Sequence, residues 1–298
     1  MQGMRPQEHE ARPAPERGVG LLNLNLSLAQ AIVALKAGLV QAYSGSAHFY
    51  EAIPIEPSSL LPIGARSLSL LRRFAECNPI YSRFSDMAVL GVPCRVYEGD
   101  INEYWLGSIK HDTSYQAFYT TWILSAYALV DKAKRLGFEQ VVDIGSGDGR
   151  ISYCAQAADM RACGIEIDEG LVELQGRISQ KAGVKHDTRC ADATQFDYSS
   201  LGLKKPPAFF ISGMPEMGEM LANSVISEVL SIPGMHDAGF VFMGTHTPKK
   251  YSRDRLQWGW GSVIKSHGLE VMDTITLPTQ WTADQEMDTP YVFTRRGF

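Results

Sequence analysis

The sequence predicts an α/β fold with a doubly wound, mostly parallel sheet, and three observations support this prediction. Short apolar segments alternate with helical ones from residue 140 to residue 266, which is the order of βαβ units. The first apolar segment, Val141 to Ile144, is rich in β-branched residues and suits a central strand buried on both faces. A glycine-rich turn at 145–149 follows it and precedes a helical segment, so a ligand is expected at the carboxyl ends of the strands.

The elements of this sheet come from the C-terminal part of the chain. Strands are expected at 140–144, 162–167, 188–190, 208–212, 239–243, 270–277 and 291–294. Helices are expected at 114–136, 151–158, 169–181, 217–230 and 252–266. Aromatic and aliphatic residues three and four positions apart predict the first of these helices, and Gly137 ends it. The last two strands form a closing pair, which completes a sheet of seven strands.

The N-terminal part reads as a tail followed by a helical extension. Residues 1–18 carry charges of both signs and three prolines without an apolar core, so we expect a disordered tail and no secretory signal. Within 19–112, helices are expected from Ser27, a capping residue, to about Tyr43 and again at 65–75. The proline-rich residues 47–64 read as an irregular connector, and 89–97 as a short strand interrupted by Pro93. This extension either covers one end of the 113–298 domain, forms an oligomer contact, or acts as a lid, and the oligomeric state stays open.

Composition restricts the partners and the compartment. A net charge of −5 argues against a broad cationic face, so nucleic acid is not the expected partner. The five cysteines show no metal-binding spacing, which favours free thiols in a reducing compartment and no metal. The most apolar stretch, 21–40, is interrupted by Asn, Gln and Lys side chains, so no membrane span is expected. Together these features predict a cytoplasmic protein.

The glycine turn differs from the dinucleotide-binding and P-loop motifs. Gly145, Gly147 and Gly149 permit positive φ angles and a close approach of the backbone to a ligand. Their spacing is G-x-G-x-G, one residue shorter than the G-x-G-x-x-G of dinucleotide sites. Asp148 inside the turn is expected to repel a pyrophosphate, and no G-x-x-x-x-G-K-[ST] occurs.

Acidic residues at the ends of three successive strands narrow the choice of ligand. Asp143 precedes the turn, Glu166 ends the second strand and Asp192 follows the third. Glu166 falls 21 residues after Gly145, close to the spacing at which an acid accepts hydrogen bonds from ribose hydroxyls. An acid-rich site suits a cationic ligand that carries a ribose and an adenine, which describes S-adenosylmethionine (SAM).

With these features, residues 113–298 resemble the class I SAM-dependent methyltransferases, which have a Rossmann-like sheet. The resemblance implies that the turn contacts the methionine part of SAM, that Glu166 holds the ribose and that Asp192 and Ala193 meet the adenine. Tyr115 and Tyr119, on the helix before the turn, either close over the methionine end or pack on the apolar face of that helix. The cofactor-binding residues implied are Tyr115, Asp143, Ile144, Gly145, Ser146, Gly147, Gly149, Glu166, Ile167, Asp192, Ala193 and Ser212.

The segment after the fourth strand, 212–221, usually faces the acceptor in this family. It lacks the N-P-P-[YF] or D-P-P-Y of enzymes that methylate base nitrogens, and no Pro-Cys nucleophile is present. Residues 143–151 resemble the small archaeal and mitochondrial-type lysine methyltransferases, which implies N-methylation of lysine in a protein substrate. Tyr119, Ser212 and His246 are the candidates that line the acceptor site. Trp258, Trp260 and Trp281 form an aromatic wall or pack in the core.

Other functions remain open. Gly147-Asp148-Gly149 and the acidic end of the second strand also resemble aminopropyltransferases of the spermidine-synthase type, although Ser212-Gly213 stands where that family needs an acid. A small-molecule or RNA methyltransferase, and a catalytically silent SAM-binding subunit, are the remaining alternatives.

Overall fold

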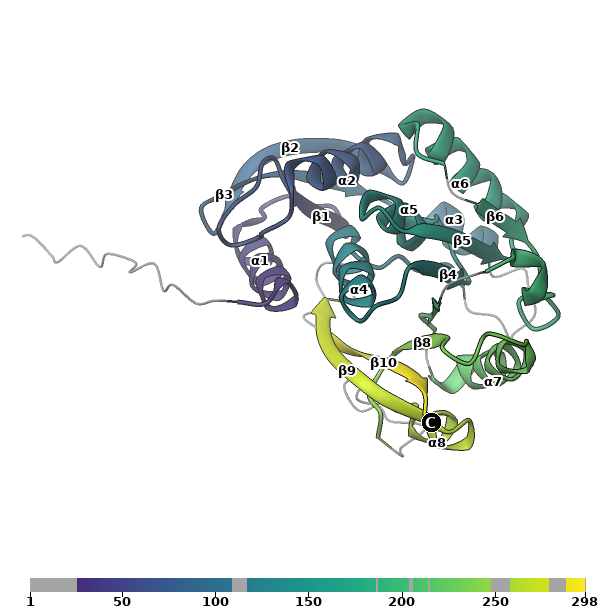
Figure 1. The fold of residues 1–298 in the computed structure, drawn as a ribbon. Coiled ribbons are helices and arrows are strands. Elements are labelled where there is room, and N and C mark those ends of the chain that lie inside the picture. Colours follow the sequence, from purple (N-terminus) through teal and green to yellow (C-terminus); the bar gives the residue numbers. More distant parts are fainter. Residues whose placement is uncertain are drawn as a thin grey trace, which may run out of the picture.

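The computed structural model describes residues 26–108, 117–185, 187–203, 206–213, 215–247, 258–278 and 288–297. Its main feature is a seven-stranded sheet in the order β6-β5-β4-β7-β8-β10-β9 (Figure 1). The strands are β4 (Gln140–Ile144), β5 (Arg161–Glu166), β6 (Asp187–Cys190), β7 (Pro207–Ile211), β8 (Gly239–Met243), β9 (Leu269–Pro278) and β10 (Asp288–Arg296). The strands from β6 to β8 are parallel, and β10 runs antiparallel to β8 and β9. The predicted fold class and sheet are confirmed.

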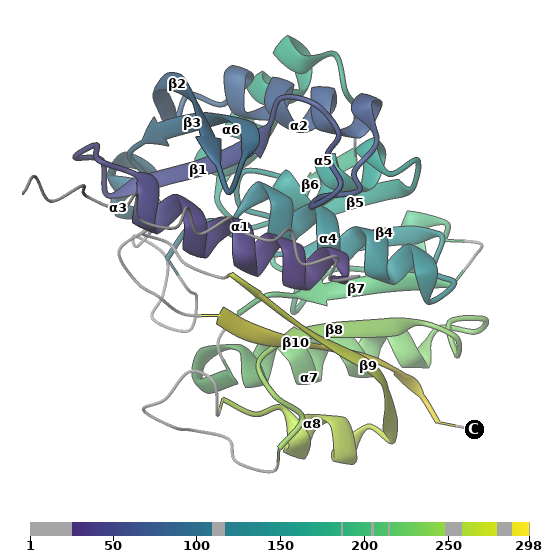
Figure 2. The ribbon, with the colours of Figure 1, turned by 90° about the vertical axis from the view of Figure 1, so that its left-hand side faces the viewer.

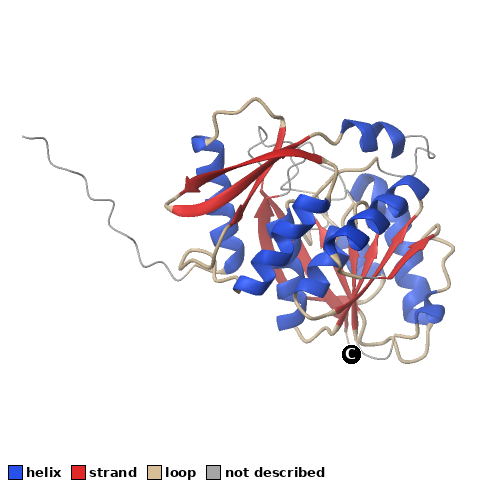
Figure 3. Cartoon of the chain, turned by 90° about the horizontal axis from the view of Figure 1, so that it is seen from above, coloured by secondary structure: helices blue, strands red, loops and turns tan. Residues whose placement is uncertain are grey.

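Helices cover both faces of the sheet (Figures 2 and 3). They are α4 (Ile123–Arg135), α5 (Arg150–Ala157), α6 (Glu169–Ala182), α7 (Pro215–Ser231) and α8 (Gly261–Ser266), with a 3-10 turn at Tyr198–Leu201. On β4, Val141 belongs to the apolar cluster that contains α4, α5 and α6, while Val142 and Ile144 belong to the cluster under α7 and α8. Successive strand residues point to opposite faces, so a continuous β-branched run is what a strand covered on both sides requires.

The N-terminal extension contains helices, as expected, and also a three-stranded antiparallel sheet in the order β1-β3-β2. Its elements are α1 (Leu28–Ala42), β1 (Phe49–Pro54), α2 (Ala65–Cys77), β2 (Tyr81–Val89), β3 (Val92–Gly99) and α3 (Asn102–Ser108). Residues 47–64 are therefore not irregular throughout. Every residue of β1 is buried, so the alternation that marks a half-buried strand is missing from its sequence. The strand predicted at 89–97 is confirmed from residue 92 onward as part of β3, whereas Val89 ends β2. Between them Leu90 and Gly91 turn the chain with φ angles of 50° and 77°, which makes β2 and β3 a hairpin.

The extension packs against the larger domain on two sides. Helix α1 contacts α4 and β9, and α2 contacts α5 and α6. Residues of α1, β1, α2 and β3 belong to the same buried apolar cluster as residues of α4, α5 and α6. The helix α1 begins after the predicted cap, since the Ser27 side chain accepts a hydrogen bond from the Gln30 amide at 3.3 Å.

Two of the predicted helices are shorter than expected. The helix predicted at 114–136 begins only at Ile123; residues 117–122 form a loop, and 109–116 lie outside the described residues. The helix predicted at 252–266 begins at Gly261, with 252–257 outside the described residues. Residues 258–260 are held as a β-bridge instead, because Thr245 exchanges backbone hydrogen bonds with Trp258 and Trp260. Tertiary contacts override helical spacing in both places.

None of the helices in the described ranges is long and apolar enough to cross a membrane. Across the same residues, no group of three or more His, Cys, Asp or Glu side chains could hold a metal ion. The five cysteines are free thiols, and Cys94, Cys154 and Cys163 are buried.

Candidate functional site

A cavity of about 220 Å³ opens at the carboxyl ends of β4, β5 and β7. The strand ends, the glycine turn, the 117–122 loop and the start of α7 all contribute to its wall. The residues that line it are Ser108, Ala117, Phe118, Tyr119, Thr121, Ile144, Gly145, Gly147, Glu166, Ile167, Asp168, Leu171, Thr194, Ser212, Gly213, Met217, Gly218, Met220, Leu221 and Met243. This is the edge of the sheet at which open α/β folds bind ligands.

The glycine turn needs its glycines for their backbone angles. Gly145, Gly147 and Gly149 have φ values of 70°, 57° and 78°, all in the left-handed region that disfavours other residues. The amides of Gly145 and Ser146 both donate to the Ile165 carbonyl, which joins the turn to the end of β5. A Cβ on Gly147 would lie 2.8 Å from the Phe118 ring, so the loop and the turn are in close contact.

Glu166 connects the turn to the end of β5. One carboxylate oxygen accepts from the Gly147 amide at 2.7 Å, and the other accepts from the Asp168 amide at 3.0 Å. Burial raises the pKa of Glu166, and the amide hydrogen bonds oppose that rise. A carboxylate has about four acceptor positions, so these two bonds leave capacity for ligand hydroxyls. Asp168 lines the cavity beside it and caps α6 by accepting from the Leu171 amide at 3.0 Å.

Asp143 is buried at the end of β4 and is not among the residues that line the cavity. Burial, together with the nearby carboxylates of Glu166 and Asp148, raises its pKa to about 8.

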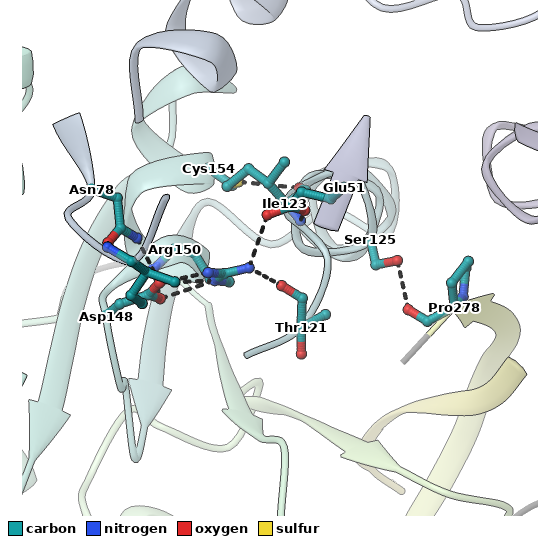
Figure 4. Close-up of polar contacts among 10 residues, drawn as sticks. Glu51, Asn78, Thr121, Ile123, Ser125, Asp148, Arg150, Cys154 and Pro278 are labelled. Carbon is teal, nitrogen blue, oxygen red and sulfur yellow. Dashed lines mark hydrogen bonds and ion pairs between the residues drawn. The ribbon is translucent and has the colours of Figure 1, made fainter. Parts of the chain in front are cut away.

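Asp148 does not take the role expected of it. It is buried behind the turn, where its carboxylate accepts from Arg150 Nε at 2.9 Å and Nη2 at 2.6 Å (Figure 4). Asn78 donates a further hydrogen bond to Asp148 at 3.0 Å. Because Arg150 neutralises its charge, Asp148 gives no reason to exclude a pyrophosphate, and that part of the sequence interpretation is wrong.

The charge of the cavity wall still favours a cation. Among the described residues that line the cavity, the charged side chains are Glu166 and Asp168, and both are acidic. The neighbouring part of the wall is uncharged, with Tyr119, Ser212 and three methionine side chains. A site of this composition attracts a cationic nucleoside and repels a diphosphate.

The cavity brings together about half of the residues predicted to form the site. The residues that line it are Ile144, Gly145, Gly147, Glu166, Ile167, Ser212 and Tyr119, although Tyr119 lies on a loop and not on a helix. Asp143, Ser146, Gly149, Asp192, Ala193 and His246 are not among the lining residues. The Ser146 hydroxyl accepts from Gln175, and Asp192 accepts from the amide and hydroxyl of Thr194, which lines the cavity in its place. His246 is exposed beyond β8, and Tyr115 lies outside the described residues.

The two of these tryptophans that the structure describes, Trp258 and Trp260, form no aromatic wall at the cavity. Trp260 is buried, stacks on Phe242 with ring centroids 5.0 Å apart and donates to the Met243 carbonyl. Trp258 is also buried, and neither lines the cavity. Trp281 lies outside the described residues.

Several lining residues were not predicted. Asp168 had a recognisable signal, because it follows Glu166 by two residues and precedes a helix as a cap. Met217, Met220 and Leu221 lie at helical spacing on α7, the segment expected to face the acceptor. Phe118 and Met243 had no local signal, since tertiary packing brings them to the cavity.

Replacing Glu51 by glutamine is expected to reduce the pH dependence of stability. Glu51 is fully buried near Arg150, and burial raises its pKa to about 7. The folded chain therefore keeps a proton that the unfolded chain loses above its ordinary pKa of 4.5, so this group's contribution to stability falls as pH rises from there to about 7. Glutamine resembles the protonated acid, so the variant should be more stable than the parent at pH 8, by about 3 kcal/mol at most, and similar to it at pH 4.5.

Urea unfolding at several pH values measures this difference. Asp143, whose pKa is also raised, makes the free energy of unfolding fall with rising pH in both proteins, so its effect cancels when the two are compared. Equal slopes in the parent and in Glu51→Gln would mean that Glu51 is ionised throughout.

Comparisons with known proteins give similarity of structure only. No known family model and no curated protein matches the sequence. Magnesium protoporphyrin IX methyltransferase from Synechocystis with bound SAM has a TM-score of 0.40 and 18% identity over 59% of this chain and 78% of that one. The tRNA (uracil-54, C5)-methyltransferase from Pyrococcus abyssi, in complex with S-adenosyl-L-homocysteine, has a TM-score of 0.43 and 16% identity. The match covers 72% of this chain and 44% of that one. A SAM-dependent methyltransferase from Clostridium acetobutylicum has a TM-score of 0.40 and 9% identity, over 57% of this chain and 89% of that one. At these scores the functional interpretation rests on the cavity itself.

Proposed function

We propose that this chain is an enzyme that binds SAM in the cavity and transfers its methyl group to an acceptor. The observation that carries the proposal is the acidic strand end, Glu166 and Asp168, placed against a glycine turn in a cavity without a described basic side chain in its wall. SAM carries a sulfonium and an ammonium group, and its ribose hydroxyls suit the remaining acceptor positions of Glu166. A dinucleotide would bring two phosphate charges to the same acidic wall.

Each part of SAM can then be assigned to residues that line the cavity. The turn from Gly145 to Gly147 takes the methionine end, Glu166 takes the ribose, and Ile167 with Thr194 lies where the adenine is expected. Ser146, Gly149, Asp192 and Ala193 do not line the cavity but adjoin residues that do, since Ser146 lies between Gly145 and Gly147 and Asp192 accepts from Thr194.

For the acceptor we propose a lysine side chain of a protein. The reaction is an in-line displacement in which the amine nitrogen bonds to the methyl carbon, the carbon–sulfur bond breaks, and S-adenosylhomocysteine leaves as a neutral thioether. The amine must first lose a proton to water, because a free lysine has a pKa of about 10.4. Uncharged walls and the nearby sulfonium cation both lower that pKa. Tyr119, Ser212 and Met217 line the part of the cavity that would surround the amine.

A small apolar molecule is the second candidate acceptor. Met217, Met220 and Met243 line the cavity, and flexible methionine side chains adapt to ligands of different shape. The aminopropyltransferase alternative is less well supported, because Ser212 and Gly213 line the cavity after β7 where that reaction needs an acid.

Incubation of the chain with methyl-labelled SAM and fractionated cell extract tests the function and the acceptor together. Label that enters a macromolecular fraction and is released by protease, not by nuclease, supports a protein acceptor. Label in the small-molecule fraction supports the second candidate. Label that resists protease and is lost to nuclease would contradict both candidate acceptors, the lysine side chain and the small apolar molecule. Methylthioadenosine as the product would indicate aminopropyl transfer.

A further inference from the structure

We propose that Arg150 is a positioning residue through which the N-terminal extension holds the cofactor site in shape. The inference rests on the proposed function, because it takes SAM as the ligand of the cavity. It assigns the extension a fixed role in building the site, in place of a lid or an oligomer contact.

The guanidinium of Arg150 joins two walls of the cavity from behind. On one side it forms a forked ion pair with Asp148, which lies between Gly147 and Gly149 in the turn. On the other side its Nη1 donates to the backbone carbonyl of Thr121, in the 117–122 loop (Figure 4). The same loop places the Phe118 ring against Gly147. One buried side chain therefore fixes the distance between the turn and the loop.

The extension surrounds this guanidinium with groups from three positions. Asn78, which follows α2, donates to Asp148 at 3.0 Å. Phe74 of α2 lies under the guanidinium, with its ring centroid 5.6 Å away. Glu51 of β1 accepts from the Ile123 amide at 2.7 Å, which fixes the end of the loop where α4 begins. These groups come from a part of the chain that does not itself line the cavity, apart from Ser108 of α3.

The charges of the cluster match this role. Arg150 and Asp148 form a buried neutral pair, with Arg150 only 3% exposed. The other Glu51 oxygen lies 3.6 Å from Arg150 Nη1, too far for a hydrogen bond, and has no hydrogen-bond partner in the described residues. Asp148 and Thr121 therefore provide the short contacts of Arg150, and Glu51 acts on the loop through Ile123. A lysine at 150 keeps the charge but cannot hold both Asp148 oxygens and the Thr121 carbonyl at once.

Arg150→Lys is the test, with two measurements. We expect the dissociation constant for SAM, from calorimetric titration, to rise at least about tenfold, as the loss of one charge-assisted hydrogen bond implies. We also expect amide hydrogen exchange of peptides covering 117–122 to accelerate severalfold in the ligand-free protein. A purely structural role would lower the melting temperature without changing either quantity.

Arg95→Lys is the matched control. Arg95 lies on β3 of the extension, pairs with Asp86 and Glu76, and packs over the Phe84 ring at 4.6 Å, but it does not line the cavity. It should leave SAM affinity and loop exchange unchanged. If Arg150→Lys does not fold, Asn78→Ala is used instead, because it keeps the buried ion pair of Arg150 and Asp148. This variant should raise the dissociation constant for SAM about threefold.

The outcomes separate the two proposals. The positioning role alone would be overturned if the parent protein binds SAM and Arg150→Lys has the same SAM affinity and the same amide exchange in 117–122 as the parent. If Asn78→Ala is used instead, a SAM affinity equal to that of the parent would overturn it. A parent protein that binds no SAM would overturn the proposed function and this inference with it.

Discussion

Replacing Gly147 by valine is expected to weaken SAM binding by about a hundredfold or more. Gly147 has a φ of 57°, where a residue with a Cβ is strained by about 1–2 kcal/mol, and a β-branched residue by more. The new Cβ would also lie 2.8 Å from the Phe118 ring, so the turn or the loop must move. Either movement changes the wall that takes the methionine end of SAM. Calorimetric titration of SAM into the parent and the variant measures the effect.

Gly202→Val separates backbone strain from the effect on the cavity. Gly202 has the same φ of 57°, ends a 3-10 turn and has no atom within 4 Å of a built Cβ. It does not line the cavity. The control should lose stability while keeping its SAM affinity. Unchanged affinity in Gly147→Val would place the ligand elsewhere.

Replacing Glu166 by alanine is expected to have an effect of similar size. The change removes the proposed acceptor of the ribose hydroxyls and leaves the Gly147 and Asp168 amides without their partner. Hydrogen bonds to a charged group contribute about 1.5–3 kcal/mol each, so losing those to the ribose corresponds to roughly a hundredfold in SAM affinity. Glu166→Gln retains the shape and one acceptor oxygen, so its SAM affinity should lie between those of the parent and the alanine variant.

Glu169→Ala serves as the control for a nearby acid. Glu169 lies in the first turn of α6, is exposed and does not line the cavity. The substitution Glu169→Ala removes one negative charge near the same end of β5, as Glu166→Ala does. The SAM affinity of this control should stay within about twofold of that of the parent protein. If Glu166→Ala and Glu169→Ala behave alike, Glu166 is not a ligand of the cofactor.

The sheet and the glycine turn could be predicted because their signals are local. A β-branched run, glycines at alternate positions and an acid at the end of the next strand all lie within short segments, and β4, β5 and β8 appear where expected. The acidic end of β5 lines the cavity through Glu166 and the following Ile167.

The roles of Asp148 and of the 117–122 loop depend on contacts that are distant in sequence. Asp148 pairs with Arg150 only two residues later, but Asn78, which also donates to it, lies 70 residues earlier. The loop has helical spacing, but the Phe118 amide donates to Ser108 and the Ile123 amide donates to Glu51, so helix α4 starts late. No pattern within the loop itself contains this information.

Strand β1 of the extension was missed for a related reason. Glu51 is an acid inside a strand whose residues are all buried, which breaks the expected alternation. Its burial is understandable only together with Arg150 and the start of α4. Function and local pattern conflict at this residue, as is common where a side chain supports a site.

Calorimetric titration of the full chain with SAM, with S-adenosylhomocysteine and with NAD in separate experiments tests the cofactor site most directly. We predict saturable one-to-one binding of SAM and S-adenosylhomocysteine and no binding of NAD, because the charged groups that line the described cavity are Glu166 and Asp168. Binding of NAD without binding of SAM, or no binding of any of the three, would contradict the proposed cofactor.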